Sequence, residues 1–498
     1  MNVARWMERR SFIEPDALTL KEGSVSLNNA EFYGRMLRAT SFLNSHGISP
    51  DDRVAVLLYN SSLFLELFFA TARLGAIFVP LNYRLASMEL DYMLKNSGSR
   101  LLVFDPDFSN KVEGTEVAEK VQILFPSGKD GLAELPFDSE PGAKGAPDEK
   151  EVSADTPLLI LYTSGTTGRP KGATLTHGNV FWNAVMHLNE GLYREKALAN
   201  APFFHVGGLN AIATHNLHSR GSLIIERSFD ARRALELIER ERVTCMFGAP
   251  TMLDMITREP LFETADLSSV RYFMAGAAPV PINLIEKFHK RGIRIRQGLG
   301  LTECAPAVCL LHDQYALLKP GSCGKEFFHL EVRIVDEGGK DVAQGELGEI
   351  IVKGPNVMIG YWGDPESTLQ TLRDGWLYTG DLGRKDSDGF IYVVDRKKDM
   401  IISGGENIYP AEVESVLVQH GDVAEVAVIG IPDSKWGEVP LAYIVPEPGT
   451  TPQPEELMKF CNSRIARYKI PKQFRFVREL PKIVTGKVDK KVLRQISM

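Results

Sequence analysis

The segment Tyr162-Thr-Ser-Gly-Thr-Thr-Gly-Arg-Pro-Lys-Gly-Ala173 decides how the rest of the sequence is interpreted. It contains four Ser/Thr hydroxyls, three glycines and two cations, and it follows the apolar run Leu158–Leu161. Glycines let a backbone approach a bulky anion, while hydroxyls and N–H groups donate to its oxygens and Arg169 and Lys171 supply positive charge. The segment therefore predicts a loop that holds a polyphosphate at the end of a strand.

The spacing excludes the common P-loop. That loop needs Gly-x-x-x-x-Gly-Lys followed by Ser or Thr at the start of a helix. Here Lys171 is followed by Gly172 and by a second apolar segment, Ala173–Leu175, which we expect to be a strand. A helix is expected only near Asn179, which is a candidate N-cap.

Length and composition limit the class of protein. A chain of 498 residues predicts roughly two to four structural units. Its 44% hydrophobic and 24% charged residues are typical of a soluble globular protein, and a net charge of −7 without a basic block argues against a nucleic-acid partner. Five cysteines without metal-site spacing, and the absence of a secretory pattern at the start, favour a cytoplasmic location.

The most apolar region, Val54–Pro80, is interrupted by Asn60, Glu66 and Arg73. It is therefore expected to be a core helix and strand rather than a transmembrane segment. A transient contact with a membrane surface and a homodimer both stay open.

Hydrophobic periodicity predicts layered α/β structure in most of the chain. Short apolar strands alternate with amphipathic helices from Leu27 to Phe125 and again after the polyphosphate loop as far as about Leu301. Strands expected between Leu330 and Lys353 are typical of a small antiparallel barrel. We expect a large N-terminal domain at residues 1–397 and a small α+β domain at residues 398–498.

Further segments follow in a fixed order along the chain. They are Pro202-Phe-Phe-His-Val-Gly-Gly208, Ala275-Gly-Ala-Ala-Pro279, Gln297-Gly-Leu-Gly-Leu-Thr-Glu303, Trp376-Leu-Tyr-Thr-Gly-Asp381, Asp395-Arg-Lys-Lys-Asp399, Ile401-Ile-Ser-Gly-Gly-Glu-Asn-Ile-Tyr-Pro410, Asp433-Ser-Lys-Trp-Gly-Glu438 and Pro481-Lys-Ile-Val-Thr-Gly-Lys487. Together with the loop they resemble the adenylate-forming superfamily, in particular its acyl-CoA synthetases. Within this branch the chain is most similar to bacterial medium- and long-chain fatty-acid–CoA ligases, especially through Met400–Tyr409 and Lys435–Glu438.

The resemblance implies an ATP site. It assigns Thr302 to the α-phosphate, Glu303 to Mg²⁺ and Asp381 to the ribose hydroxyls, and carboxylates suit the last two tasks. The other residues that it implies at the nucleotide are Thr163, Ser164, Gly165, Thr166, Thr167, Gly168, Lys171, Gly276, Ala277, Ala278, Gln297, Gly298, Leu299 and Arg396. At the position of Leu299 the family commonly has an aromatic residue stacked on adenine, so that stacking is in doubt here.

The same resemblance assigns roles to the C-terminal domain. Lys487 is implied to bridge the carboxylate and the α-phosphate during adenylation. The small domain is implied to be mobile and to rotate about Lys398, its hinge, between the two reaction steps. Gly404 and Gly405 are implied to line the tunnel for the pantetheine arm of CoA. Trp436 either borders CoA or packs within the small domain.

The acid site is implied by the remaining segments, and His205 is assigned there with a catalytic role beside Lys487, Thr302 and Glu303. The candidate wall residues are His205, Val206, Gly207, Gly276, Gly298, Cys304 and Pro306. The expected activity is an ATP-dependent acyl-CoA synthetase that uses Mg²⁺ and CoA and acts on a medium- or long-chain fatty acid. An aryl acid of the cinnamate or benzoate type, a carrier-loading adenylation enzyme and a non-catalytic nucleotide-binding module remain as alternatives.

Overall fold

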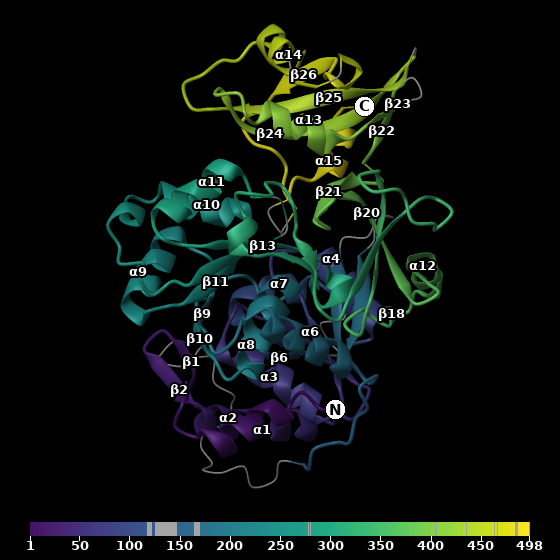
Figure 1. Ribbon diagram of the computed structural model, residues 1–498. Helices are drawn as coiled ribbons and strands as arrows, with labels where there is room; N and C mark the ends of the chain where they lie inside the picture. Colours follow the sequence, from purple (N-terminus) through teal and green to yellow (C-terminus); the bar gives the residue numbers. More distant parts are fainter. Residues whose placement is uncertain are drawn as a thin grey trace. The chain divides into compact units, whose positions relative to one another are not determined.

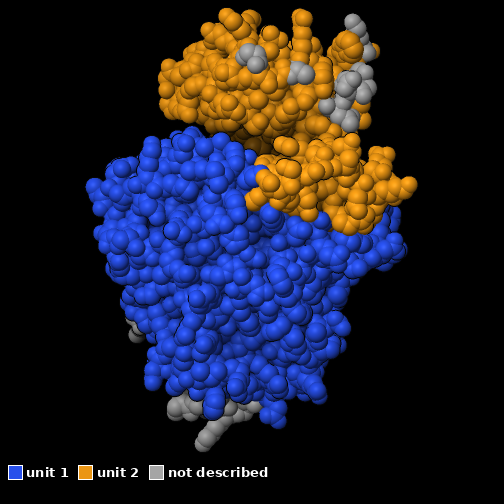
Figure 2. All heavy atoms as spheres, viewed as in Figure 1, with its two compact units in different colours: residues 1–332, 352–377 blue, residues 333–351, 378–498 orange. Residues whose placement is uncertain are grey.

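A computed structural model describes most of the chain as two compact units. The residues it describes are 1–116, 122–124, 147–163, 170–276, 278, 280–397, 399–403, 406–434, 436–462, 464–465, 467–483 and 487–497. Unit 1 comprises Met1–Val332 and Val352–Leu377, and unit 2 comprises Arg333–Ile351 and Tyr378–Met498 (Figure 2). The predicted division at residues 397 and 398 lies within unit 2 and stays a prediction.

Unit 1 contains a seven-stranded sheet that carries the hairpin of the polyphosphate loop. Its order is β18 (Gly360–Tyr361), β8 (Lys171–Thr176), β7 (Pro157–Thr163), β4 (Ile77–Pro80), β3 (Arg53–Leu57), β5 (Leu101–Phe104) and β6 (Gln122–Leu124). The strands from β7 to β6 are parallel, whereas β8 and β18 are antiparallel to their neighbours. The two central strands β3 and β4 are buried on both faces, which explains their continuous apolar sequences.

The helix between β3 and β4 confirms that the apolar region Val54–Pro80 is core. Helix α3 (Ser62–Arg73) begins at the N-cap Ser61, and its residues from Ser62 to Ala72 are buried. Helix α2 (Asn29–Ser45) packs against it and begins with a capping box formed by Asn28 and Glu31. Within the described part of the chain, no helix is long and apolar enough to cross a membrane.

A second, nine-stranded sheet forms the other half of unit 1. Its order is β15 (Lys325–Glu326), β14 (Ala307–Leu311), β13 (Ile295–Gly300), β12 (Tyr272–Ala275), β11 (Cys245–Gly248), β9 (Lys196–Ala199), β10 (Ser222–Ile225), β1 (Leu18–Glu22) and β2 (Val25–Asn28). The strands from β13 to β1 are parallel. The predicted α/β layering is thereby confirmed.

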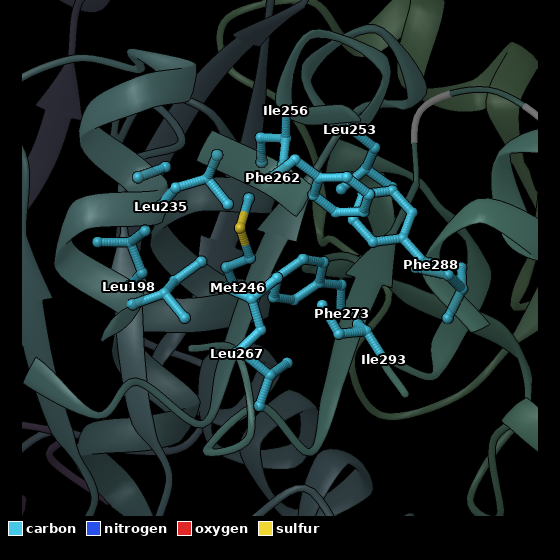
Figure 3. Packing of buried hydrophobic residues seen from close by; sticks show 14 of the residues in the cluster. Leu198, Leu235, Met246, Leu253, Ile256, Phe262, Leu267, Phe273, Phe288 and Ile293 are labelled. Atoms are coloured by element: carbon cyan, nitrogen blue, oxygen red, sulfur yellow. The ribbon is translucent and has the colours of Figure 1, made fainter. Parts of the chain in front are cut away.

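Three amphipathic helices cover this sheet (Figure 1). They are α9 (Ala231–Glu241), α10 (Pro250–Arg258) and α11 (Ile282–Lys290), and they bury Leu235, Ile256 and Phe288 against strand residues. Figure 3 shows Met246 of β11 and Phe273 of β12 facing Leu235, Phe262 and Phe288 in this core. Because these helices pack against the strands, the carboxyl ends of the strands give rigid support to the loops that follow them.

The helix after the hairpin starts earlier than predicted. Helix α6 (His177–Asn189) has Thr176 as its N-cap, and Asn179 is the third helical residue. The two side chains form a reciprocal capping box, in which Thr176 Oγ1 accepts from the Asn179 N–H at 3.1 Å and Asn179 Oδ1 accepts from the Thr176 N–H at 2.8 Å. The expectation that Asn179 is the N-cap was wrong because both residue types can cap a helix.

Unit 2 contains two smaller sheets. The segment predicted as a barrel contributes β16 (Glu331–Val335) and β17 (Gly348–Lys353), which join β20 (Trp376–Lys385), β19 (Leu372–Arg373) and β21 (Ile391–Arg396) in a five-stranded sheet that extends across the unit boundary. The C-terminal sheet consists of β23 (Glu406–Ile408), β22 (Ile401–Ser403), β25 (Gly437–Pro446), β24 (Val423–Asp433) and β26 (Gln473–Phe476). Helices α13 (Pro410–Leu417), α14 (Pro454–Asn462) and α15 (Lys490–Gln495) pack on it, giving the predicted α+β composition.

Candidate active site

The polyphosphate loop connects the two antiparallel strands β7 and β8. Thr163 and Lys171 are paired at the end of the hairpin where the loop begins, and the Thr163 hydroxyl donates to the Lys171 carbonyl at 3.5 Å. A Cβ on Gly172 would lie 2.6 Å from Ile160 Cγ2, so this position needs glycine if the two strands are to pair this closely. The predicted residues Ser164, Gly165, Thr166, Thr167 and Gly168 lie outside the described residues.

Tyr361 connects this hairpin to Glu303, although the two are far apart in sequence. The Lys171 ammonium lies 5.4 Å from the centre of the Tyr361 ring, and the Tyr361 hydroxyl donates to Glu303 Oε1 at 2.9 Å. All three side chains are half-buried. The predicted phosphate cation and the predicted metal ligand are therefore brought together by a residue that the sequence analysis did not identify.

Two buried asparagines hold the backbone around Glu303. Asn356 is fully buried, and its side-chain amide donates to the carbonyls of Cys304 and, at 2.8 Å, Ala307. Asn179 donates to the carbonyls of Pro355 and Val357, both at 2.9 Å, and so joins the same segment to helix α6. These hydrogen bonds hold the backbone of the turn Thr302–Cys304 in place.

The predicted adenine-side loop follows β12 and lies against β13. Gln297 of β13 accepts a hydrogen bond from the Val280 N–H at 3.2 Å through its side-chain oxygen, which holds the far end of the loop. A Cβ on Gly276 would lie 3.7 Å from the Gly298 carbonyl oxygen, so the two predicted glycines are neighbours. Ala278 and the half-buried Leu299 are also present at this edge, and Ala277 lies outside the described residues.

His205 lies on a loop that the first α/β layer holds in place. Asn60, which follows β3, accepts from the Phe203 N–H at 2.8 Å and donates to the Ala201 carbonyl at 2.9 Å. The Phe204 ring contacts Tyr83 with ring centres 5.0 Å apart, and His205 then serves as the N-cap residue of the short helix α7 (Val206–Gly208). A π-helical segment, Leu209–Thr214, continues this helix, and such segments are frequent at functional sites.

The ring of Phe247 lies between two predicted acid-site glycines. A Cβ on Gly207 would lie 2.9 Å from Cε1 of this ring, and a Cβ on Gly276 would lie 3.0 Å from Cε2. Both distances are shorter than a side chain tolerates without movement, so the two glycines leave the room that the ring occupies. Phe247 is half-buried at the carboxyl end of β11 and places a flat aromatic surface between the two loops.

The other wall residues follow β13. Pro306 is tied to the strand by the Leu301 N–H, which donates to the Pro306 carbonyl at 3.0 Å. Cys304 is fully buried, and burial, with a smaller contribution from the Glu303 charge, raises the pKa of its thiol well above the usual value. Cys304 is therefore a neutral packing residue rather than a nucleophile.

In unit 2, strands β20 and β21 bring Asp381 and Arg396 together. The two residues are paired in register, and Arg396 Nε lies 2.5 Å from Asp381 Oδ1. The Asp381 side chain is 5% exposed, whereas that of Arg396 is 41% exposed. Thr379 holds the backbone at Asp381, because its hydroxyl accepts from the Asp381 N–H at 3.0 Å and donates to the Ile350 carbonyl at 2.7 Å.

Lys487 lies close to this pair. It belongs to a tight loop in which the Ile483 N–H donates to the Lys487 carbonyl at 2.7 Å and the Asp489 N–H donates to the Pro481 carbonyl at 2.7 Å. The pKa of the Lys487 ammonium is lowered, first by protein atoms that displace water around it and next by the charge of Arg396, whereas Asp381 acts in the opposite direction. Three residues predicted from separate segments thus meet in unit 2.

The residues predicted for CoA are less fully described. Trp436 is 45% exposed in the loop between β24 and β25. Gly404, Gly405 and the predicted hinge residue Lys398 lie outside the described residues.

Comparison with known proteins identifies the family. The profile of the AMP-binding enzymes matches residues 2–362, and that of the AMP-binding enzyme C-terminal domain matches residues 412–487. The chain belongs to the AMP-binding enzyme family, which is the adenylate-forming superfamily that the motifs resemble. It is an AMP-forming acid–CoA ligase, and the predicted use of ATP, Mg²⁺ and CoA is confirmed for this class.

Several relatives match this AMP-binding enzyme over nearly its whole length. It is 43% identical to a feruloyl-CoA synthase from an Amycolatopsis species over 98% of each protein. It is 40% identical to the indoleacetate–CoA ligase of Aromatoleum aromaticum, over 100% of this chain and 98% of that protein. The long-chain-fatty-acid–CoA ligase FadD13 of Mycobacterium tuberculosis is 37% identical, with 99% and 98% covered.

A solved relative agrees in fold. The o-succinylbenzoate CoA synthetase of Bacillus subtilis, in complex with ATP and magnesium, superposes with a TM-score of 0.86 at 34% identity and covers 98% of both chains. Glu303 of this AMP-binding enzyme suits a magnesium ion because it offers a half-buried carboxylate, the oxygen ligand that hard cations prefer.

Proposed function

We propose that this enzyme is a CoA ligase for an aromatic carboxylic acid of the cinnamate or arylacetate type. The observation that carries the proposal is the Phe247 ring between Gly207 and Gly276. A flat ring in an acid site favours a flat substrate because offset or edge-to-face aromatic pairs gain about 0.5–1.5 kcal/mol beyond buried area. The relatives that are feruloyl-CoA synthase and indoleacetate–CoA ligase support the same substrate class.

The reaction has two steps. In the first, a carboxylate oxygen of the acid attacks the α-phosphorus of ATP, and the bond from that phosphorus to the pyrophosphate oxygen breaks. In the second, the CoA sulfur attacks the acyl carbonyl carbon, and the bond from that carbon to the AMP oxygen breaks. The products are acyl-CoA, AMP and pyrophosphate.

Each proposed role follows from charge and position. Lys171 and the loop before it hold the departing β- and γ-phosphates, and Thr302 contacts the α-phosphate. Asp381, whose carboxylate is paired with Arg396 and whose backbone is held by Thr379, accepts hydrogen bonds from the ribose hydroxyls. Lys487 offsets the repulsion between the carboxylate and the α-phosphate, and His205 borders the acid. Bound at Glu303, Mg²⁺ would neutralise phosphate charge.

A fatty-acid ligase is the second candidate. The 37% identity to FadD13 favours it, and small wall residues such as Gly207 also leave room for an alkyl chain. The predicted medium- or long-chain preference is therefore kept as an alternative. The predicted cytoplasmic location and a homodimer stay predictions.

The test is CoA-dependent AMP release with a panel of acids. Ferulate and indoleacetate should give kcat/KM values at least about tenfold above those of octanoate and palmitate, the scale on which a shaped apolar pocket discriminates. A reversed order would establish the fatty-acid alternative. Pyrophosphate exchange without any thioester product would instead indicate a carrier-loading enzyme.

A further inference from the structure

The segment Gly354–Trp362 connects two parts of the proposed nucleotide site. Its strand β18 pairs with β8, where Tyr361 is opposite Ala173, and the Trp362 N–H donates to the Gly172 carbonyl at 2.7 Å. Earlier in the segment, the Met358 N–H donates to the Glu303 carbonyl at 2.8 Å. The backbone therefore fixes both the hairpin and the Glu303 turn before any side chain is considered.

The Tyr361 side chain adds a contact to each part. Its hydroxyl donates to Glu303 Oε1 at 2.9 Å, and its ring lies 5.4 Å from the Lys171 ammonium. The tyrosine itself is held by its own backbone, because its N–H donates to Thr368 Oγ1 at 2.9 Å. A single anchored side chain thus orients a carboxylate with its polar end and a cation with its ring.

The two contacts have separate physical consequences. A hydroxyl bonded to one carboxylate oxygen restricts the rotation of the carboxylate while the other oxygen can still meet a cation, and such supporting bonds tune metal affinity. The ring face attracts an ammonium through its quadrupole without consuming any of the ammonium's hydrogen-bond donors. The ring thereby holds the Lys171 ammonium without using the N–H groups that are proposed to bind the phosphates.

We infer that Tyr361 is a positioning residue that orients Glu303 for a divalent cation and Lys171 for the phosphates of ATP. The inference rests on the proposed roles of those two residues. It concerns a residue of this chain that acts through its neighbours and makes no bond to the reacting atoms.

The two contacts can be removed one at a time. Tyr361→Phe removes the hydroxyl and keeps the ring, whereas Tyr361→Leu removes both. Tyr92→Phe is a matched control, because the Tyr92 hydroxyl donates to the Pro170 carbonyl of the same hairpin at 3.3 Å and does not contact Glu303. Glu303→Gln reports separately on the proposed metal ligand.

The measurement is equilibrium binding of Mn²⁺ to the full-length protein in the presence of ATP, followed by electron paramagnetic resonance, together with ATP affinity and the thermal unfolding midpoint. Tyr361→Phe should weaken Mn²⁺ binding about tenfold, as expected for loss of a bond that supports a metal ligand, with an unchanged unfolding midpoint. Tyr361→Leu should weaken Mn²⁺ equally and should also weaken ATP binding roughly two- to fivefold, the equivalent of one exposed cation–π contact. Tyr92→Phe should bind Mn²⁺ as the unmutated protein does.

Two results would overturn the inference alone. The first is that Tyr361→Phe binds Mn²⁺ as tightly as the unmutated protein while Glu303→Gln binds it more weakly. The second is that Tyr361→Phe and Tyr92→Phe lose Mn²⁺ affinity to the same extent. If Glu303→Gln itself binds Mn²⁺ normally, the proposed role of Glu303 fails, and the inference fails with it. The failure of the inference alone is thereby distinguishable from the failure of the site assignment.

Discussion

Phe247 is the residue whose replacement should change acid selectivity. Phe247→Leu removes a ring face but keeps an apolar side chain between Gly207 and Gly276, so the fold should be retained. We expect kcat/KM for ferulate to fall roughly two- to twelvefold, the equivalent of one aromatic pair, while the value for octanoate is unchanged or higher. Initial rates of CoA-dependent AMP release for both acids measure this ratio.

An equal loss for both acids would contradict an aromatic-specific role of Phe247. Gly276→Ala provides a related variant, since its Cβ would lie 3.0 Å from the ring and would force the ring to move. Gly276→Ala should therefore alter the ratio of the two kcat/KM values by displacing the ring, although residue 247 is still phenylalanine.

Single residues also show what the sequence could predict. Glu303, Asp381 and Lys487 were predicted because each lies in a segment whose local composition resembles the family. Tyr361 and Phe247 were not predicted, because their contacts join segments that are far apart along the chain and depend on strand register and packing. Glycines gave the only sequence indication of Phe247, since Gly207 and Gly276 mark positions where another group approaches closely.

At the scale of elements, helices α6 and α8 (His215–His218) carry four histidines, of which His177, His187 and His215 are buried and His218 is half-buried. Burial lowers the pKa of His177 to about 3 and those of His187 and His218 to about 4, and it lowers that of His215 well below the usual value. The rings of His187 and His215 are stacked with centres 4.6 Å apart. Protonation of either ring would place a charge in a dry environment beside the other.

This burial predicts a fold that loses stability in mild acid. A histidine in the unfolded chain has a pKa of about 6.5. Between this value and the lower pKa of the folded state, the unfolded chain binds protons that the folded chain does not bind. The stabilising contribution of neutral His187 is complete above about pH 6.5 and is lost as the pH falls towards 4. Each buried histidine should contribute up to about 1.4 kcal/mol per pH unit in this window.

His187→Phe should flatten the pH dependence of the unfolding midpoint, because it removes one titrating group and keeps a ring against His215. Thermal unfolding between pH 7 and pH 4.5, with His46→Gln at an exposed position as the control, measures this effect. A slope identical to that of the unmutated protein would contradict the prediction.

The elements themselves were largely predictable. Strand β3, helix α3 and strand β4 make up the apolar region Val54–Pro80 that the sequence predicts as a core helix and strand, because burial produces continuous apolar runs in central strands and in a wholly buried helix. The helix expected to begin near Asn179 begins earlier, since α6 starts at His177. Helix ends depend on capping contacts that periodicity does not report.

At the scale of the whole molecule, we propose that the two half-reactions use different residues of unit 2. Lys487, Asp381 and Arg396 lie together, and the pKa of Lys487 is lowered chiefly by the protein around it. A cation in this position is suited to the first half-reaction, in which two anions must meet. The second half-reaction, attack by CoA on a carbonyl already joined to AMP, has no such need.

The most direct test is therefore Lys487→Ala, assayed in each half-reaction separately. Its matched control is Lys482→Ala, in the same loop, where the lysine is paired with Glu425 at 2.7 Å. Acid-dependent pyrophosphate exchange should fall roughly 100- to 1000-fold in Lys487→Ala, the range seen when one group that stabilises transition-state charge is removed, and should be unchanged in Lys482→Ala. Conversion of preformed acyl-adenylate and CoA to thioester should stay near the rate of the unmutated protein in both variants. The proposed role of Lys487 would be contradicted if Lys487→Ala kept full pyrophosphate exchange, or if it lost activity equally in both half-reactions.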